Sequence, residues 1–79
     1  MKIGSPKDLG RVVRDQRKGV GLTQVRLAEL SGVSPRFIIE LEGGRPTTGF
    51  GLVLRVLSTL GLDVEVTTRL AAPPKGGKT

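Results

Sequence analysis

Apolar residues recur every three or four positions in four separate segments of the chain, a spacing that predicts four helices. In the first segment Leu9, Val12 and Val13 lie on one helical face. Ser5 is the expected N-cap of this helix, and Pro6 is its expected first residue, because the missing N–H of proline costs nothing there. Ser5 and Pro6 are adjacent, so together they predict that this helix begins at Pro6.

The second and third predicted helices are short and are separated by only the four residues SGVS. Thr23 and Ser34 are their expected N-caps. The apolar positions of the second helix are Val25, Leu27, Ala28 and Leu30, and in the third helix Ile38 and Leu41 are expected to face inward. Two short helices joined by a tight turn that contains a glycine, here Gly32, are typical of a helix-turn-helix.

The fourth predicted helix begins after Thr47 or Thr48, one of which is its expected cap, and continues to about Leu60. It carries two apolar stripes. The larger stripe comprises Phe50, Val53, Leu54, Leu57 and Leu60, and the smaller one comprises Leu52 and Val56. One small core needs only one stripe, so we expect the smaller stripe to contact a second subunit. A tightly wrapped monomer is the alternative.

The segment LDVEVTT at residues 62–68 alternates apolar and polar residues, which predicts a β-strand. The chain contains no second strand of comparable quality, and a lone strand has unpaired edges. We therefore expect Leu62, Val64 and Val66 to lie in a strand that pairs with the same strand of another copy of the chain.

The 79 residues are enough for one small domain. We expect a flexible N-terminal arm at residues 1–4, a helix-turn-helix domain at residues 5–61, a dimerisation strand at residues 62–68 and a disordered basic tail at residues 69–79. This division predicts an all-α bundle with one short β-strand at its C-terminal end.

Composition narrows the possible functions. The chain has no cysteine and no histidine, so we expect no disulfide, metal site or cofactor, and nothing in it supports catalysis. No apolar run approaches the roughly 20 residues that span a bilayer, and no hydrophobic leader follows Met1, so we expect a cytoplasmic protein without a membrane partner. The net charge of +6 suits a nucleic-acid partner, although plain solubility also explains it.

The outer face of the third predicted helix carries the candidate contacts to DNA bases, because the N-terminal part of such a helix enters the major groove. These candidates are Ser34, Pro35, Arg36, Ile39 and Glu40. Arg36 can donate two hydrogen bonds to guanine, and Glu40 either orients that guanidinium or accepts from a cytosine amine. The alternative for Arg36 is an ordinary exposed arginine paired with Glu40.

Contacts to the DNA backbone are expected around the same helix. The candidates are Thr23, Gln24, Phe37, Arg45, Thr47 and Thr48. Gln24 begins the second helix, where its side chain and nearby N–H groups can meet a phosphate, although it can equally be a plain exposed residue. Arg14 and Lys18 are weaker candidates, because charges on the first helix usually form a solvated face.

The segment LTQVRLAELSGVSPRFIIELEGGRPT is similar to the helix-turn-helix of Cro/C1-type phage repressors. The longer segment SPRFIIELEGGRPTTGFGLVLRVLSTLGLDVEV resembles the HipB-like antitoxins of HipBA toxin–antitoxin modules. The resemblance implies a lambda-repressor-like bundle that binds an inverted-repeat operator as a homodimer, with C-terminal strands paired between subunits. It also implies a structural ion pair between Arg17 and Glu42. Pro35 departs from the more polar residues common at its position, which places more weight on Arg36.

By the same resemblance, the partner is a HipA-like serine/threonine kinase toxin and the dimer represses its own operon. Two alternatives stay open. One is a stand-alone phage-like transcriptional regulator without a toxin. The other is a protein-interaction module that has lost DNA binding.

Overall fold

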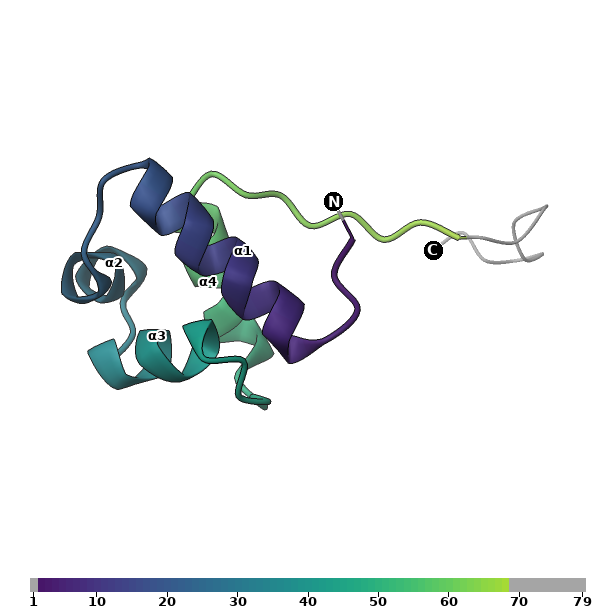
Figure 1. Ribbon diagram of the computed structural model, residues 1–79, viewed down its shortest axis with the longest axis horizontal. Coiled ribbons are helices and arrows are strands. Elements are labelled where there is room, and N and C mark those ends of the chain that lie inside the picture. The colour runs from purple at the N-terminus through teal and green to yellow at the C-terminus, as the bar shows by residue number, and fades with distance from the viewer. Residues whose placement is uncertain (1, 69–79) are drawn as a thin grey trace.

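The computed structural model describes residues 2–68, and their regular structure is entirely helical (Figure 1). The four helices are α1 (Pro6–Gly19), α2 (Gln24–Ser31), α3 (Pro35–Glu42) and α4 (Phe50–Thr59). The predicted all-α bundle is confirmed for this part of the chain. The tail predicted at residues 69–79 lies outside the described residues. No helix within residues 2–68 is long and apolar enough to cross a membrane.

A hydroxyl side chain caps each of the first three helices. Ser5, Thr23 and Ser34 each accept a hydrogen bond at 3.0–3.1 Å from the backbone N–H three residues later, as predicted. The predicted cap of α4 was wrong. Gly49 is its N-cap, and Thr47 Oγ1 instead accepts from the N–H of Gly49 at 2.9 Å, so this hydroxyl satisfies the loop rather than the helix.

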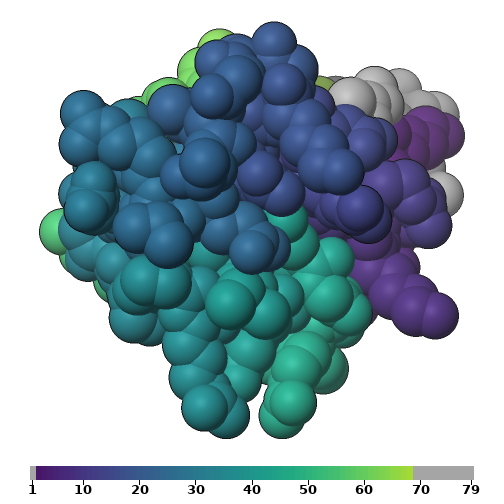
Figure 2. Space-filling model, turned by 60° about the vertical axis from the view of Figure 1, so that its left-hand side comes forward, coloured from purple at the N-terminus to yellow at the C-terminus, as the bar shows by residue number. Residues whose placement is uncertain are grey.

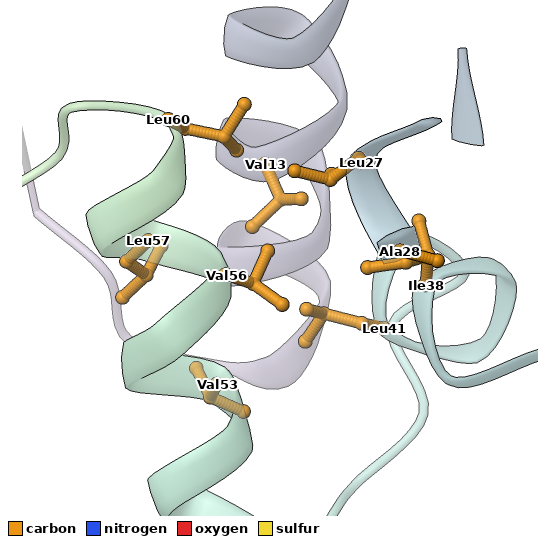
Figure 3. Close-up of a cluster of buried hydrophobic side chains, with 9 residues drawn as sticks. All are labelled: Val13, Leu27, Ala28, Ile38, Leu41, Val53, Val56, Leu57 and Leu60. Carbon is orange, nitrogen blue, oxygen red and sulfur yellow. The ribbon is translucent and has the colours of Figure 1, made fainter. Parts of the chain in front are cut away.

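The hydrophobic core lies between the four helices (Figure 3). Helix α3 packs against α1 and α2, and α2 also packs against α4. The buried apolar residues are Val13, Leu27, Ala28, Ile38, Leu41, Val53, Val56, Leu57 and Leu60. Every helix contributes to this cluster, so burial of one shared core holds the four short helices together.

Helix α4 uses one inward face, and the assignment of its two stripes was partly wrong. Val53, Val56 and Leu57 point into the core, and Val56 is fully buried, so Val56 has no surface to offer a second subunit. Phe50, expected inside, is 64% exposed. Leu52 is half-buried and Leu54 is exposed. Phe50 is the first residue of the helix, so it extends the inward stripe beyond the core into a surface groove.

Helix α2 buries less apolar surface than its sequence suggests. Of its four apolar positions, Leu27 and Ala28 are buried, whereas Val25 and Leu30 are about half exposed. Only the inner face of this eight-residue helix is covered by its neighbours. Ser31 takes a buried position instead, and its hydroxyl donates to the hydroxyl of Thr59 on α4 at 3.1 Å.

A close approach between α1 and α3 depends on Gly10. A Cβ atom at this position would lie 2.7 Å from the carbonyl oxygen of Glu42 and would also collide with that of Leu41. Only glycine lets the two helices come this close without a clash. The sequence analysis missed Gly10, although a glycine inside a helical pattern is itself a signal of close packing.

Residues 62–68 have no regular secondary structure in the single chain. Leu62 is half-buried against the core, and its N–H donates to the carbonyl of Leu57 at 2.8 Å, which ties this segment to the end of α4. The chain then runs back beside the N-terminal end (Figure 1). Val64 and Val66 are exposed. Strand pairing needs a second chain, so the predicted strand stays a prediction.

Candidate nucleic-acid interface

The turn between α2 and α3 sets the direction of α3. Gly32 has φ of 72°, a left-handed conformation that glycine adopts without strain. The N–H of Val33 then donates to the carbonyl of Ala28 at 3.0 Å and closes the end of α2. Ala28 is 1% exposed, so its small side chain lets the two helices pack closely. These contacts form a rigid helix-turn-helix.

The N-terminal half of α3 lies at the surface. Ser34, Pro35 and Arg36 are exposed, and Ile39 is 54% exposed. The opposite side of the helix buries Ile38 in the core. In Figure 2 the blue and teal atoms of α2, the turn and α3 form one continuous face, and the light-green atoms of the segment that follows α4 lie at its edge. This face is open to a large partner such as DNA.

Arg36 and Glu40 form an ion pair one helical turn apart on this face. The Nε of Arg36 donates to Oε2 of Glu40 at 3.0 Å. The side chain of Arg36 is 85% exposed, whereas that of Glu40 is 37% exposed. The structure therefore brings these two predicted site residues together, in an arrangement that fits both a free surface pair and an oriented guanidinium.

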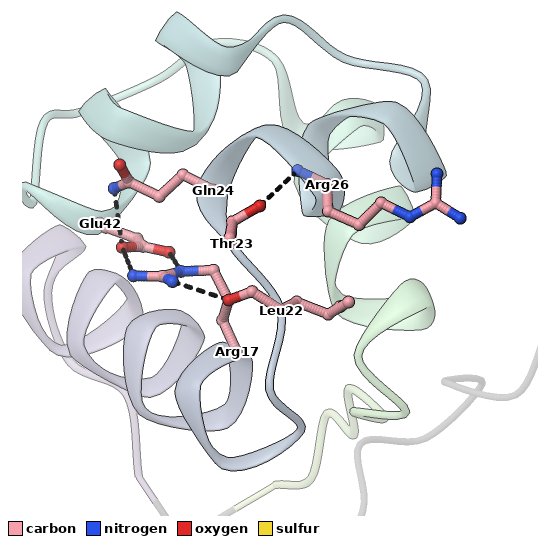
Figure 4. A network of polar contacts seen from close by, with 6 residues as sticks. All are labelled: Arg17, Leu22, Thr23, Gln24, Arg26 and Glu42. Carbon is pink, nitrogen blue, oxygen red and sulfur yellow. Dashed lines mark hydrogen bonds and ion pairs between the residues drawn. The ribbon is translucent and has the colours of Figure 1, made fainter.

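A buried network holds the C-terminal end of α3 (Figure 4). Arg17 of α1 donates from Nε and Nη2 to the two carboxylate oxygens of Glu42 at 2.6 and 3.0 Å, and from Nη1 to the carbonyl of Leu22 at 2.9 Å. The two charged side chains are only 10% and 5% exposed. The pair that the family resemblance implies is therefore present.

Glu42 also favours the charged form of Arg17. Its hydrogen bond raises the pKa of Arg17 above the already high ordinary value, more than burial lowers it. Arg17 therefore keeps its charge at every physiological pH, and the pair links α1, the start of α2 and the end of α3.

Gln24 joins this network, which the sequence analysis did not foresee. Its Nε2 donates to Oε1 of Glu42 at 3.1 Å, so its amide group is fixed beside the first turn of α2. Thr23 uses its hydroxyl as the cap of the same helix. The backbone N–H groups at this helix start and the second N–H of the Gln24 amide are the donors that a phosphate would approach.

The loop after α3 carries three more of the predicted backbone contacts. Arg45, Thr47 and Thr48 are exposed, and the N–H of Arg45 donates to the carbonyl of Glu40 at 3.0 Å, which fixes the loop to the end of α3. Phe37 is different, because its ring is half-buried and packs against the core. The ring of Phe37 helps to hold α3 against the core and offers little surface to a ligand.

A second surface feature lies between α1, α4 and the C-terminal segment. It is an apolar groove of about 560 Å³ whose lining includes Ile3, Phe50, Leu62 and Val64. No cluster of three or more acidic, histidine or cysteine side chains that could hold a metal ion occurs within residues 2–68. Within residues 2–68, the polar helix-turn-helix face and this apolar groove therefore differ in the chemistry that they offer a partner.

Comparison with known proteins identifies the family of the chain. The sequence pattern of a helix-turn-helix domain family matches residues 8–70 of the chain. The chain is 46% identical over 65 residues to an uncharacterized helix-turn-helix transcriptional regulator, y4mF, of Sinorhizobium fredii. This match covers 82% of the chain and 86% of that protein.

Two solved structures are similar in fold. One is a chain of the HipA–HipB–O2–O3 complex, with a TM-score of 0.78 and 26% identity over 89% of this chain and 99% of that chain. The other is the restriction-modification controller protein C.AhdI from Aeromonas hydrophila, with a TM-score of 0.67 and 26% identity over 73% of this chain and 84% of that chain.

Proposed function

Because the chain belongs to the Cro/C1-type helix-turn-helix family of DNA-binding transcriptional regulators, we propose that it is a sequence-specific repressor that reads an inverted repeat as a homodimer. The observation that carries the proposal is the exposed N-terminal half of α3, which presents Arg36 while Ile38 on the opposite face lies in the core. A helix held in this way can enter the major groove without unfolding.

The residues divide into two kinds of contact. Arg36 reads guanine through paired hydrogen bonds, and Ile39 meets a thymine methyl group. The contacts proposed for the DNA backbone come from Thr23, Gln24, Arg45, Thr47 and Thr48. Backbone contacts of this kind fix the register of the protein on the duplex, whereas the base contacts choose the sequence.

Homodimerisation is proposed through the apolar groove and the segment that follows α4. Ile3, Phe50 and Val64 line this groove although each is about half exposed or more, and a second copy would cover them. Leu62 and Val66 complete the strand that would pair across the two-fold axis. A dimer of this kind predicts two half-sites about one helical turn of DNA apart.

The dimer can be tested by sedimentation equilibrium at micromolar concentration. Val64→Pro should weaken self-association, because proline cannot donate to a strand ladder. A wild-type chain that sediments as a clean monomer of 8.4 kDa would contradict the dimer. A dimer that survives the Val64→Pro replacement would instead place the interface on α4.

The role in a toxin–antitoxin module is the more specific part of the proposal. It is supported by the fold shared with a chain of the HipA–HipB–O2–O3 complex. The partner proposed is a HipA-like serine/threonine kinase encoded beside this chain. Co-expression should yield a stable complex and suppress the growth arrest that the kinase causes alone. Independent purification of both proteins, with the growth arrest unchanged, would favour a stand-alone phage-like regulator.

DNA recognition itself can be tested by footprinting on the region upstream of the chain's own gene. A protected inverted repeat is expected, and Arg36→Ala should abolish the protection. Arg11→Ala is the matched control, because it removes one exposed positive charge from α1, where Arg11 likewise pairs with a carboxylate, that of Asp8, at 3.6 Å. Equal loss of protection in both variants would mean that charge alone drives binding. Diffuse, sequence-independent protection by the wild type would favour a protein-interaction module.

A further inference from the structure

We propose that Glu40 is a positioning residue, which holds Arg36 so that the end of its guanidinium meets one guanine in each half-site, and that Glu40 does not itself contact a base. This inference rests on the proposed function and deepens it. It assigns the two side chains of the α3 pair to one recognition unit, whose chemistry selects guanine at a single position.

The division of the guanidinium edges carries the inference. An arginine can offer a flat ligand two edges, one formed by Nε and Nη2 and the other by Nη1 and Nη2. Glu40 Oε2 accepts from Nε at 3.0 Å and so occupies the first edge. Within residues 2–68 neither Nη1 nor Nη2 of Arg36 has a hydrogen-bond partner, which leaves the end-on edge for guanine O6 and N7.

The two side chains are also unequal in exposure. Glu40 is the more enclosed, at 37% exposure against 85% for Arg36. The carbonyl of Glu40 accepts from the N–H of Arg45, so its backbone is held at the junction of α3 and the following loop. Glu40 is therefore the anchored partner, and the long side chain of Arg36 is the one that gains order from the contact.

The neighbouring side chains leave Arg36 as the main polar reader. Pro35 and Ile39 have no side-chain donor or acceptor. The hydroxyl of Ser34 accepts from the N–H of Phe37 as the helix cap, so only its single O–H donor is left for a base. Recognition of a base by hydrogen bonds therefore depends chiefly on the orientation of one guanidinium, and that orientation is what Glu40 controls.

Glu40 also opposes general binding, because its negative charge repels phosphates. Loss of this charge should therefore raise affinity for any duplex, whereas loss of orientation should lower the preference for guanine. These opposite effects distinguish a role of Glu40 in positioning Arg36 from a purely electrostatic effect of its charge. A surface pair without a role in reading would change specific and non-specific binding by the same factor.

The experiment uses the full chain and a library of duplexes with randomised positions, followed by affinity measurements on the selected duplex and on its single-base variants. The proteins are the wild type, Arg36→Ala, Glu40→Gln and the double variant. Glu29→Gln is the matched control, since Glu29 forms a similar exposed pair with Arg26 on α2 at 3.1 Å. Circular dichroism shows that each variant remains folded.

Arg36→Ala should reduce the guanine preference about 10-fold to 100-fold at one position of each half-site. Glu40→Gln should reduce the same preference about threefold to tenfold, the size of coupling expected between contacting residues, and should not weaken non-specific binding. In the Arg36→Ala background Glu40→Gln should leave base preference unchanged. Glu29→Gln should leave it unchanged throughout.

Three outcomes would overturn the inference. A guanine preference unaltered by Glu40→Gln would reduce the contact to a surface ion pair. Alternatively, Glu40→Gln would remove a preference for cytosine at a neighbouring base pair, both in the wild type and in the Arg36→Ala background. That result would show that Glu40 itself contacts a base. A wild type that selects no sequence would overturn both this inference and the proposed function, whereas the first two outcomes leave the proposed function intact.

Discussion

Replacement of Gly10 by alanine tests how closely α1 and α3 must pack to hold the recognition helix. The added Cβ would lie 2.7 Å from the Glu42 carbonyl oxygen, and would be closer still to that of Leu41. Comfortable carbon–oxygen contacts begin at about 3.3 Å, so the helices must separate by roughly 0.6 Å or more. Backbone carbonyls cannot rotate away as a flexible side chain would, so this separation disturbs the core.

The expected effect is the balance of two opposing terms. Overpacking of a well-filled site costs about 3 kcal/mol at the upper end of its usual range. Alanine recovers about 1 kcal/mol because it is the better helix former. Gly10→Ala should therefore lower the free energy of unfolding by about 2 kcal/mol, which corresponds to a melting temperature roughly 10 °C lower for a domain of this size.

Urea denaturation followed by circular dichroism at 222 nm measures this difference directly. Gly51→Ala is the matched control, because a Cβ at Gly51 of α4 meets no described atom within 4 Å. It should raise stability by about 0.5 to 1 kcal/mol, the usual gain in helix propensity. Equal stabilisation by both replacements would refute the close contact between α1 and α3.

Three further predictions concern the elements that fix α3. Glu42→Gln leaves the Arg17 guanidinium enclosed without an anion and should cost about 2 to 4 kcal/mol in the same urea assay; a cost below 0.5 kcal/mol would mean that water replaces the pair. Ser34→Ala removes the α3 cap and should cost about 1 kcal/mol in chemical denaturation, whereas Ser34→Asp should restore it. Gly32→Ala forces an alanine to φ of 72° and should cost about 1 to 2 kcal/mol by thermal melting, with an unchanged melting temperature contradicting the left-handed turn.

Features set by neighbouring residues were well predicted from the sequence. Ser5 and Ser34 each precede a proline, and both cap helices that begin where expected. Gly32 ends α2 in the left-handed conformation that the short turn requires. Such signals are local, because the side chain, the cap and the orphan backbone N–H groups lie within one helical turn.

Features set by the third dimension were less predictable. Every residue of α4 before Ser58 is apolar or glycine, except Arg55. Periodicity alone therefore did not reveal which face of α4 meets the core. Val56 was placed outside and Phe50 inside, and the structure reverses both. The outcome depends on where α2 packs against the helix, which no pattern within α4 records.

The candidate site shows the same division. The spacing of Arg36 and Glu40 predicts a contact one turn apart, and the structure contains it. The link from Gln24 to Glu42 joins residues 18 positions apart and was not foreseen. Residues 62–68 lack a strand in the single chain, because a strand needs a hydrogen-bonded neighbouring strand and no other segment within residues 2–68 supplies one.

The most direct test of sequence-specific recognition by α3 is the affinity for the duplex upstream of the chain's own gene, measured against a scrambled duplex at several salt concentrations near physiological. We expect a preference of about 10³ or more for the upstream duplex, maintained across the salt series. Equal affinity for both duplexes, falling steeply with salt, would contradict base recognition and show that the charge of +6 acts through phosphates alone.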